Sequence, residues 1–281
     1  MRSTVHFVGY NFKRLFTSPR PYITLLLIFS VMQVGLGGAK TYLIESGQMF
    51  QVAELYVFAH SSRVFQLVFI LGLLLLLGDA PFLKEGMSFR LIRTNRFQWL
   101  LGQFLSCVVI GAAYLLAIEL LFLLLFIGHV SFQNEWSEAV ILAAQIGNGM
   151  VLNIEMAVSF SMKIIKAGSP YAMFGLTLVY SLLLYTFFSA LLIVCNLRLR
   201  SGIGCLAVMA FWCLRLALAY KLHFPLLQWI SPCNLACLDE QILTPTSILY
   251  TTMFFSVSFC CLGVLALRFT HSADLLKGDY A

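Results

Sequence analysis

The stretch GDAPFLKEGMSFRLIRTNRFQWLLGQ, residues 78–103, sets the topology that we predict for the rest of the chain. It lies between two of the most apolar runs of the sequence, residues 65–77 and 100–127. Four basic residues, Lys84, Arg90, Arg93 and Arg96, fall between these runs. A short basic link between two apolar spans belongs on the cytoplasmic side of a membrane.

The same stretch is too apolar for a freely solvated loop, because aromatic and aliphatic residues alternate with its charges. Pro81 and Gly86 interrupt helix continuity. We therefore predict that residues 79–99 hold a short helix under the membrane, with one side on the bundle and the other facing a partner protein. The predicted partner-binding residues are Phe82, Glu85, Phe89, Arg90, Leu91, Ile92, Arg93 and Arg96.

Composition excludes a soluble domain. The 281 residues are 60% hydrophobic and only 11% charged, and several apolar runs reach the roughly 20 residues that cross a bilayer. We expect an all-α, polytopic membrane protein. The net charge of +6 reflects the cytoplasmic bias of Lys and Arg in such proteins, so it does not indicate nucleic-acid binding.

The hydropathy pattern predicts a single transmembrane domain of six spans, with both termini in the cytoplasm. The inner segments then hold 12 of the 18 basic residues and the outer segments hold five, with Arg215 inside a span. This is a clear positive-inside bias. The predicted spans are residues 22–39, 63–78, 100–128, 171–197, 202–220 and 248–269.

Two segments beside the spans carry further expectations. Residues 1–21 have apolar positions at helical spacing around Lys13 and Arg14, which predicts an amphipathic helix on the inner membrane face. A basic flank that only fixes topology is the alternative.

Residues 129–170 are predicted to form an outer loop. Its apolar part, 139–161, is interfacial or re-entrant, because a crossing there would place the later basic residues outside.

The sequence offers no enzyme chemistry. It contains no GxxxxGK[ST] phosphate loop, no HExxH and no GxSxG, and its five histidines are scattered over different loops. Cys233 and Cys237 share an outer loop, where a disulfide or two free thiols are alternatives. No histidine or further cysteine completes a metal site beside them, so we predict no metal.

Two charged residues fall within predicted spans. Glu119 lies in the span 100–128, where a charge costs about 2.5–3.5 kcal/mol to insert. It is either a polar contact in a translocation path or at a subunit seam, or a protonated or helix-paired residue with a packing role. Arg215 is expected near the outer boundary, where its side chain can snorkel toward water.

Three stretches and the six-span layout resemble the type-2 exporter class of ATP-binding-cassette (ABC) transporter permeases, in a variant found in small Gram-positive permeases. NFKRLFTSPRPYITLLL (11–27) resembles the connector helix of that class, and residues 78–105 lie where the class has its coupling helix. SPCNLACLD (231–239) resembles the segment before the sixth span. The class has an acidic residue and a Gly–Thr pair in the coupling region, whereas here Glu85 and Gly86 are followed by Met87.

The resemblance implies a permease subunit in the bacterial plasma membrane that exports an amphipathic molecule, such as an antimicrobial peptide or a drug. It implies separate nucleotide-binding ATPase subunits that hold ATP and Mg²⁺, and a second permease chain, identical or paralogous. This chain itself would bind no cofactor and no nucleic acid, and would not be an enzyme. The alternatives are an ion-coupled secondary transporter and a membrane scaffold or sensor that transports nothing.

Overall fold

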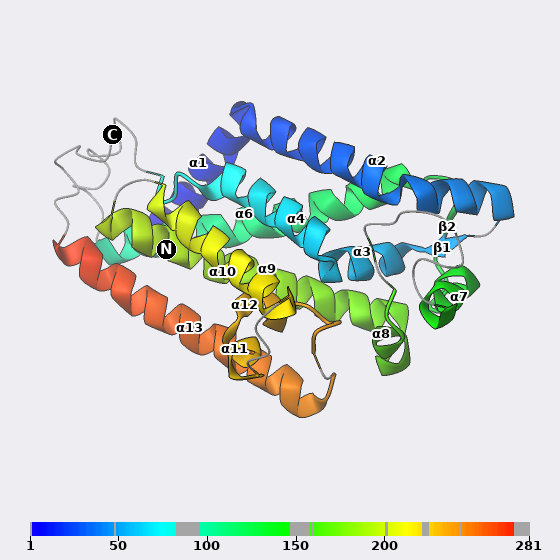
Figure 1. Cartoon of the computed structure of the whole chain (residues 1–281). Coiled ribbons are helices and arrows are strands. Elements are labelled where there is room, and N and C mark those ends of the chain that lie inside the picture. Colours follow the sequence, from blue (N-terminus) through cyan, green and yellow to red (C-terminus); the bar gives the residue numbers. More distant parts are fainter. Residues whose placement is uncertain are drawn as a thin grey trace.

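The computed structural model describes residues 2–47, 49–82, 96–146, 158, 160–199, 202–220, 225–241 and 243–272. The described chain is built from helices, which confirms the all-α prediction (Figure 1). Two-residue strands, β1 (Phe50–Gln51) and β2 (Val130–Ser131), pair in parallel and join two connecting segments.

Long helices run back and forth between two ends of the molecule (Figure 1). In the part described they are α2 (Arg20–Ser46), α4 (Arg63–Leu77), α6 (Arg96–Leu125), α9 (Pro170–Arg198), α10 (Ile203–Tyr220) and α13 (Pro245–Ser272). At one end, called the α1 end, lie α1 (Arg2–Thr17) and the last turns of α4, α9 and α13. At the opposite end lie α3 (Val52–Ser61), α7 (Glu138–Ile146) and α8 (Met162–Ala167).

Prolines mark several helix starts, because a proline in the first turn loses no intrahelical hydrogen bond. They occur at the start of α2, of α9, of α13 and of the short α11 (Pro225–Ile230) and α12 (Pro232–Leu235). The two short helices lie between α10 and α13 (Figure 1).

Four of the described helices are long and apolar enough to cross a membrane: α2 over Arg20–Thr41, α6, α9, and α13 over Pro245–Thr270. Helices α3 and α4 qualify together as a fifth crossing, but they bend by 87° at Ser62. Helix α4 alone has 15 residues, so it is only about 22 Å long. Helix α10 is also short. The two predicted spans 63–78 and 202–220 thus form helices. That these two helices cross the membrane stays a prediction.

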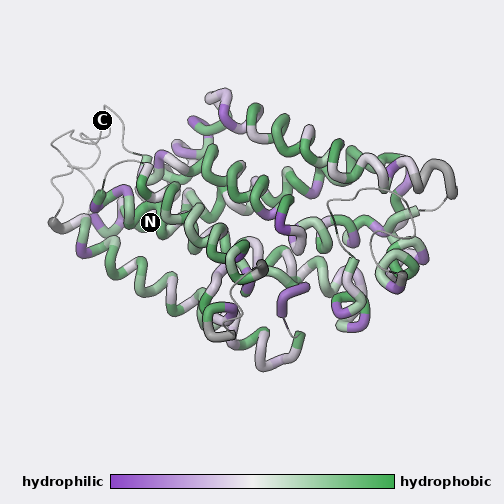
Figure 2. Tube along the Cα trace, in the orientation of Figure 1, coloured by the Kyte–Doolittle hydropathy of each residue, from purple (hydrophilic) through white to green (hydrophobic). Residues whose placement is uncertain are grey.

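Helix α9 is the centre of the bundle. We compare the 18-residue apolar stretch of each long helix: 61% of its residues are buried in α9, against 28% in α2 and 11% in α13. The outer helices instead expose aliphatic side chains such as Leu26, Val34, Met253 and Val257. Figure 2 shows apolar residues along the helices and polar residues gathered toward their ends. An apolar exterior of this kind suits a protein surrounded by lipid.

The segment at the N-terminus is helical, as predicted. Helix α1 packs on α6: Phe7 is buried, and the Asn11 side-chain amide donates a hydrogen bond to the Ser106 hydroxyl at 3.0 Å. In residues 129–170, α7 and α8 have nine and six residues, too few to cross a membrane. Residues 147–157 lie outside the described residues, so the choice between an interfacial and a re-entrant helix stays open.

Two helices extend beyond the predicted spans. Helix α2 continues past residue 39 to Ser46, and α6 begins at Arg96, within the predicted link 79–99. The physical reason for the early start of α6 is the burial of Trp99, whose side chain is fully enclosed by the bundle. The middle of the link, residues 83–95, lies outside the described residues. The short helix predicted there is therefore not described, and neither are Glu85, Phe89, Arg90, Leu91, Ile92 and Arg93.

Candidate functional site

The turn that follows α4, residues 78–82, is held by an asparagine of the central helix. The Asn196 side-chain amide donates to the carbonyl oxygens of Gly78 at 3.1 Å and Ala80 at 2.7 Å. Its oxygen accepts from the Gly204 backbone N–H at 3.3 Å, at the start of α10. A Cβ on Gly204 would meet this oxygen at 2.9 Å, so a larger residue there would displace the Asn196 side chain. Asn196 thus joins α4, α9 and α10 at one point.

Two further helices hold the same turn. The side-chain oxygen of the buried Gln103, on α6, accepts from the Phe82 backbone N–H at 3.3 Å. Arg20, at the start of α2, pairs with Asp79 at 2.6 Å. Both of these charged side chains are nearly half exposed, so the pair contributes at most about 1 kcal/mol. The turn is nevertheless in contact with α2, α6, α9 and α10, and it is the last described piece before residues 83–95.

Two of the eight predicted partner-binding residues are described. Phe82 is half-buried and packs against the core. Arg96 donates to the Thr270 carbonyl oxygen at 2.6 Å, in the last turn of α13, where a basic side chain satisfies carbonyls left free by the helix. Both residues therefore contact their own chain at the α1 end.

Glu119 lies on α6, away from this turn. Both of its carboxylate oxygens are buried, and neither has a hydrogen-bond partner among the residues that the structure describes. A buried carboxylate without a partner is costly. The arrangement is compatible with either predicted role, a polar contact in a path or seam and a protonated packing residue.

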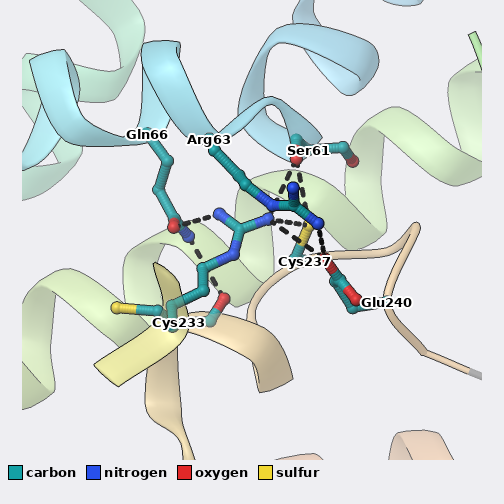
Figure 3. Close-up of polar contacts among 7 residues, drawn as sticks. Ser61, Arg63, Gln66, Cys233, Cys237 and Glu240 are labelled. Carbon is teal, nitrogen blue, oxygen red and sulfur yellow. Dashed lines mark hydrogen bonds and ion pairs between the residues drawn. The ribbon is translucent and has the colours of Figure 1, made fainter. Parts of the chain in front are cut away.

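A second polar site, which the sequence reading missed, surrounds Arg215 on α10 (Figure 3). The Arg215 side chain is only 1% exposed, and its guanidinium donates to the Gln66 side-chain oxygen. It also donates to the Ser61 carbonyl oxygen at 3.0 Å and to Cys237 Sγ at 2.9 Å. We call the following set the Arg215 cluster: Ser61, Arg63, Gln66, Arg215, Cys233, Cys237 and Glu240.

The remaining contacts of the cluster join the α3–α4 corner to the segment before α13. The Gln66 side-chain amide donates to the Cys233 carbonyl oxygen at 3.2 Å. Glu240 lies 3.3 Å from the Arg63 guanidinium and 4.0 Å from that of Arg215. Because Glu240 is about one-third exposed, it links the buried charge to the surface of the protein.

The expectation that Arg215 snorkels toward water is wrong. Arg215 lies near the end of α10, but its side chain points into the protein. The physical reason is the bend at Ser62, which ends α3 and leaves the Ser61 carbonyl free to accept. The partners Ser61 and Gln66 lie about 150 residues away in sequence, so no local pattern identifies them.

The two cysteines of the cluster are free thiols, which decides between the two alternatives for this pair. Cys237 Sγ also donates to the Ser61 carbonyl oxygen at 3.3 Å. Burial raises the pKa of Cys233 to about 12. Burial also raises the pKa of Cys237, and the nearby Arg215 guanidinium opposes that rise only in part. Both thiols therefore stay protonated at neutral pH.

Glu54, on α3, lies in the core of the protein. It is fully buried, and its carboxylate accepts from the Gln51 backbone N–H at 3.0 Å and from the Ser137 hydroxyl at 2.8 Å. The Ser137 backbone N–H donates to it as well. The first contact belongs to a capping box in which Gln51 is the N-cap residue of α3, a signal visible in the sequence as Gln and Glu three residues apart.

Comparison of the chain with protein-family models, curated proteins and solved structures finds no match. Within the described ranges, no group of three or more His, Cys, Asp or Glu side chains is arranged to hold a metal ion.

Proposed function

We propose that the chain is the membrane-spanning permease subunit of an ATP-driven exporter, coupled to separate nucleotide-binding subunits. The observation that carries this proposal is the attachment of the turn 78–82 at the α1 end, directly to α2, α6 and α9 and through Asn196 to α10. A force applied to the adjoining residues 83–95 would reach four helices at once.

The arrangement of the helices supports the six-span topology of the proposal. Six helices alternate in direction, so α1 and the end of α13 lie at the same end (Figure 1). The basic residues Lys13, Arg14, Arg96, Arg198 and Arg268 belong to the helix segments at that end. The positive-inside rule then assigns the α1 end to the cytoplasm. The shorter α4 and α10 would cross by thinning the bilayer locally, at a modest energetic cost.

In the proposed mechanism, ATP and Mg²⁺ are bound by the partner ATPase subunits. Closure of those subunits pushes on residues 79–99, and the helices attached to the turn rearrange to move substrate outward. Two permease chains, identical or paralogous, form the pathway in the bacterial plasma membrane. An amphipathic substrate, such as an antimicrobial peptide or a drug, suits the apolar character of the helices.

An ion-coupled secondary transporter is the second candidate, and Glu119 is the observation that favours it. Its buried carboxylate has no partner in the described part of the chain, and an ionisable group of this kind inside a membrane is a candidate ion or proton site. The two functions differ in their energy source. Transport that persists in sealed vesicles without ATP, and collapses with the ion gradient, would favour the secondary transporter.

Co-purification tests the main proposal. A P-loop ATPase subunit should remain bound when the full chain is purified in mild detergent. The double variant Phe89→Ala with Ile92→Ala should weaken that association roughly thirtyfold, since a hot-spot truncation costs about 2 kcal/mol or more. The control Glu45→Ala, at the end of α2 away from the turn, should leave the association unchanged. Normal ATPase binding and transport by the double variant would leave residues 79–99 as a simple topological link.

A further inference from the structure

Two neighbouring hollows share the inner face of α1. The first, of about 240 Å³, is lined by the polar residues Asn11, Arg14, Ser18, Arg20 and Asp79 and by four apolar residues. The second is an apolar groove between α1, α2 and α6. Leu15 and Leu76 line both hollows, so the two lie next to each other. Together we call them the α1 cleft.

The polar part of the α1 cleft carries a net positive charge. Arg14 and Arg20 contribute two positive charges and Asp79 contributes one negative charge, which leaves +1. Arg20 is paired with Asp79 at 2.6 Å, whereas Arg14 has no ion-pair partner among the residues described. A group with a single negative charge, such as a phosphodiester, is complementary to this arrangement.

Asn11 adds an unused acceptor at the wall of the same hollow. Its side chain is 4% exposed, and its amide N–H donates to Ser106 at 3.0 Å. Its side-chain oxygen is buried and has no partner in the described structure. Buried polar atoms are normally paired, and a ligand that carries a hydrogen-bond donor would supply this oxygen with a partner.

The groove is lined almost wholly by apolar side chains, among them Phe12, Phe16, Leu25, Ala113 and Ala117. It holds about 70 Å³, which suits part of one hydrocarbon chain rather than a folded segment. It opens beside an amphipathic helix at one end of the apolar bundle, where the headgroups of a bilayer leaflet would lie. A hollow with net positive charge therefore adjoins an apolar groove at the α1 end of the bundle.

We propose that the α1 cleft binds one anionic glycerophospholipid of the surrounding leaflet. Its phosphodiester lies at Arg14 and Arg20, a hydroxyl of a phosphoglycerol headgroup donates to the Asn11 oxygen, and the start of one acyl chain fills the groove beside Ala117. The proposal needs only the membrane character of the chain, and it holds whether or not the chain couples to an ATPase. Bound lipid would join α1 to α2 and α6.

Native mass spectrometry of the full chain in detergent tests this site. The delipidated protein is titrated with phosphatidylglycerol, with phosphatidylcholine of the same acyl chains, and with inorganic phosphate as competitor. We expect one phosphatidylglycerol to bind in preference to phosphatidylcholine, and inorganic phosphate not to displace it. Equal binding of both lipids would overturn the proposal. Displacement by inorganic phosphate would also overturn it, since the cleft would then be a site for a free anion.

Two variants and one control locate the lipid. Arg14→Gln should weaken phosphatidylglycerol binding about fivefold, the effect of roughly one basic residue at an anionic lipid surface. Ala117→Leu should weaken binding of that lipid by narrowing the groove, and it leaves the charge unchanged. Lys163→Gln on α8, at the opposite end, removes a charge of the same sign and should have no effect. If all three variants bind the lipid as the wild type does, the α1 cleft is not the site.

Discussion

Replacing Arg215 by methionine tests whether the Arg215 cluster holds the α3–α4 corner to α10. Methionine keeps the length and apolar stem of the side chain but removes every donor. The Gln66 side-chain oxygen then loses its described donor. The Ser61 carbonyl keeps a contact with the Cys237 thiol at 3.3 Å, so it is not left without a partner. The variant therefore leaves one buried acceptor unpaired.

An unpaired buried acceptor costs about 1–3 kcal/mol, so we expect the free energy of unfolding to fall by about 2 kcal/mol. Gln66→Leu should cost more, about 3 kcal/mol, because it leaves a buried guanidinium without that acceptor. The double variant removes both groups and should cost at least about 1 kcal/mol less than the sum, since residues of one network couple by roughly 0.5–3 kcal/mol. The Cys233 carbonyl loses the Gln66 donor in both the single and the double variant, so this effect cancels.

Denaturant-induced unfolding in detergent micelles measures these differences, with the exposure of the buried Cys233 and Cys237 thiols as the signal. Glu240→Gln is the matched control. Glu240 is about one-third exposed and lies 4.0 Å from the guanidinium, so its loss should cost under about 1 kcal/mol. Strict additivity of the Arg215 and Gln66 variants would refute the reasoning, because it would mean that the two side chains do not interact.

Three further outcomes are expected. Alkylation at pH 8 should modify Cys233 more than about a thousandfold slower than an ordinary thiol, because burial raises its pKa to about 12 and only the thiolate reacts. Peptide mass spectrometry measures the rate of alkylation, and rapid labelling of Cys233 in the folded protein would contradict the expectation. Asn196→Leu should lower the free energy of unfolding by about 2 kcal/mol, because it removes the side-chain amide that donates to the Gly78 and Ala80 carbonyl oxygens. An unchanged denaturation midpoint would mean that other contacts hold the turn. If Glu119 contacts substrate or a seam, Glu119→Gln should alter transport-linked ATPase stimulation while assembly stays intact, whereas wild-type transport by Glu119→Leu would leave only a packing role.

Much of the fold follows from hydropathy alone. The predicted span 171–197 matches α9 to within one residue at each end, and 248–269 lies inside α13. A long apolar run surrounded by lipid has to satisfy its own backbone hydrogen bonds, so it forms a helix whatever its neighbours are. The start of α6 was misplaced for a related reason. Trp99 looks like part of an aromatic link in the sequence, and its burial depends on what packs around it.

The candidate sites also contain some features that the sequence predicts and others that depend on packing. Hydropathy and basic residues indicate that residues 79–99 are a functional link. The capping box of Gln51 and Glu54 joins residues that are close in sequence, so the sequence alone can reveal it. The residues that hold the link, Asn196 and Gln103, look like ordinary polar residues within apolar runs. Their role depends on the turn at residues 78–82, which for Asn196 lies more than 100 residues away.

Hydropathy and charge act residue by residue against lipid and water, so the amino-acid sequence alone predicts that this protein is helical, apolar and polarised by charge. The partners of its buried polar groups depend on the tertiary packing. Arg215 was expected to reach water, and instead it is enclosed by carbonyl, amide and thiol groups that the bend at Ser62 and the segment before α13 bring to it. A buried charge is stable only when distant parts of the chain converge on it, and that convergence is a property of packing rather than of local sequence.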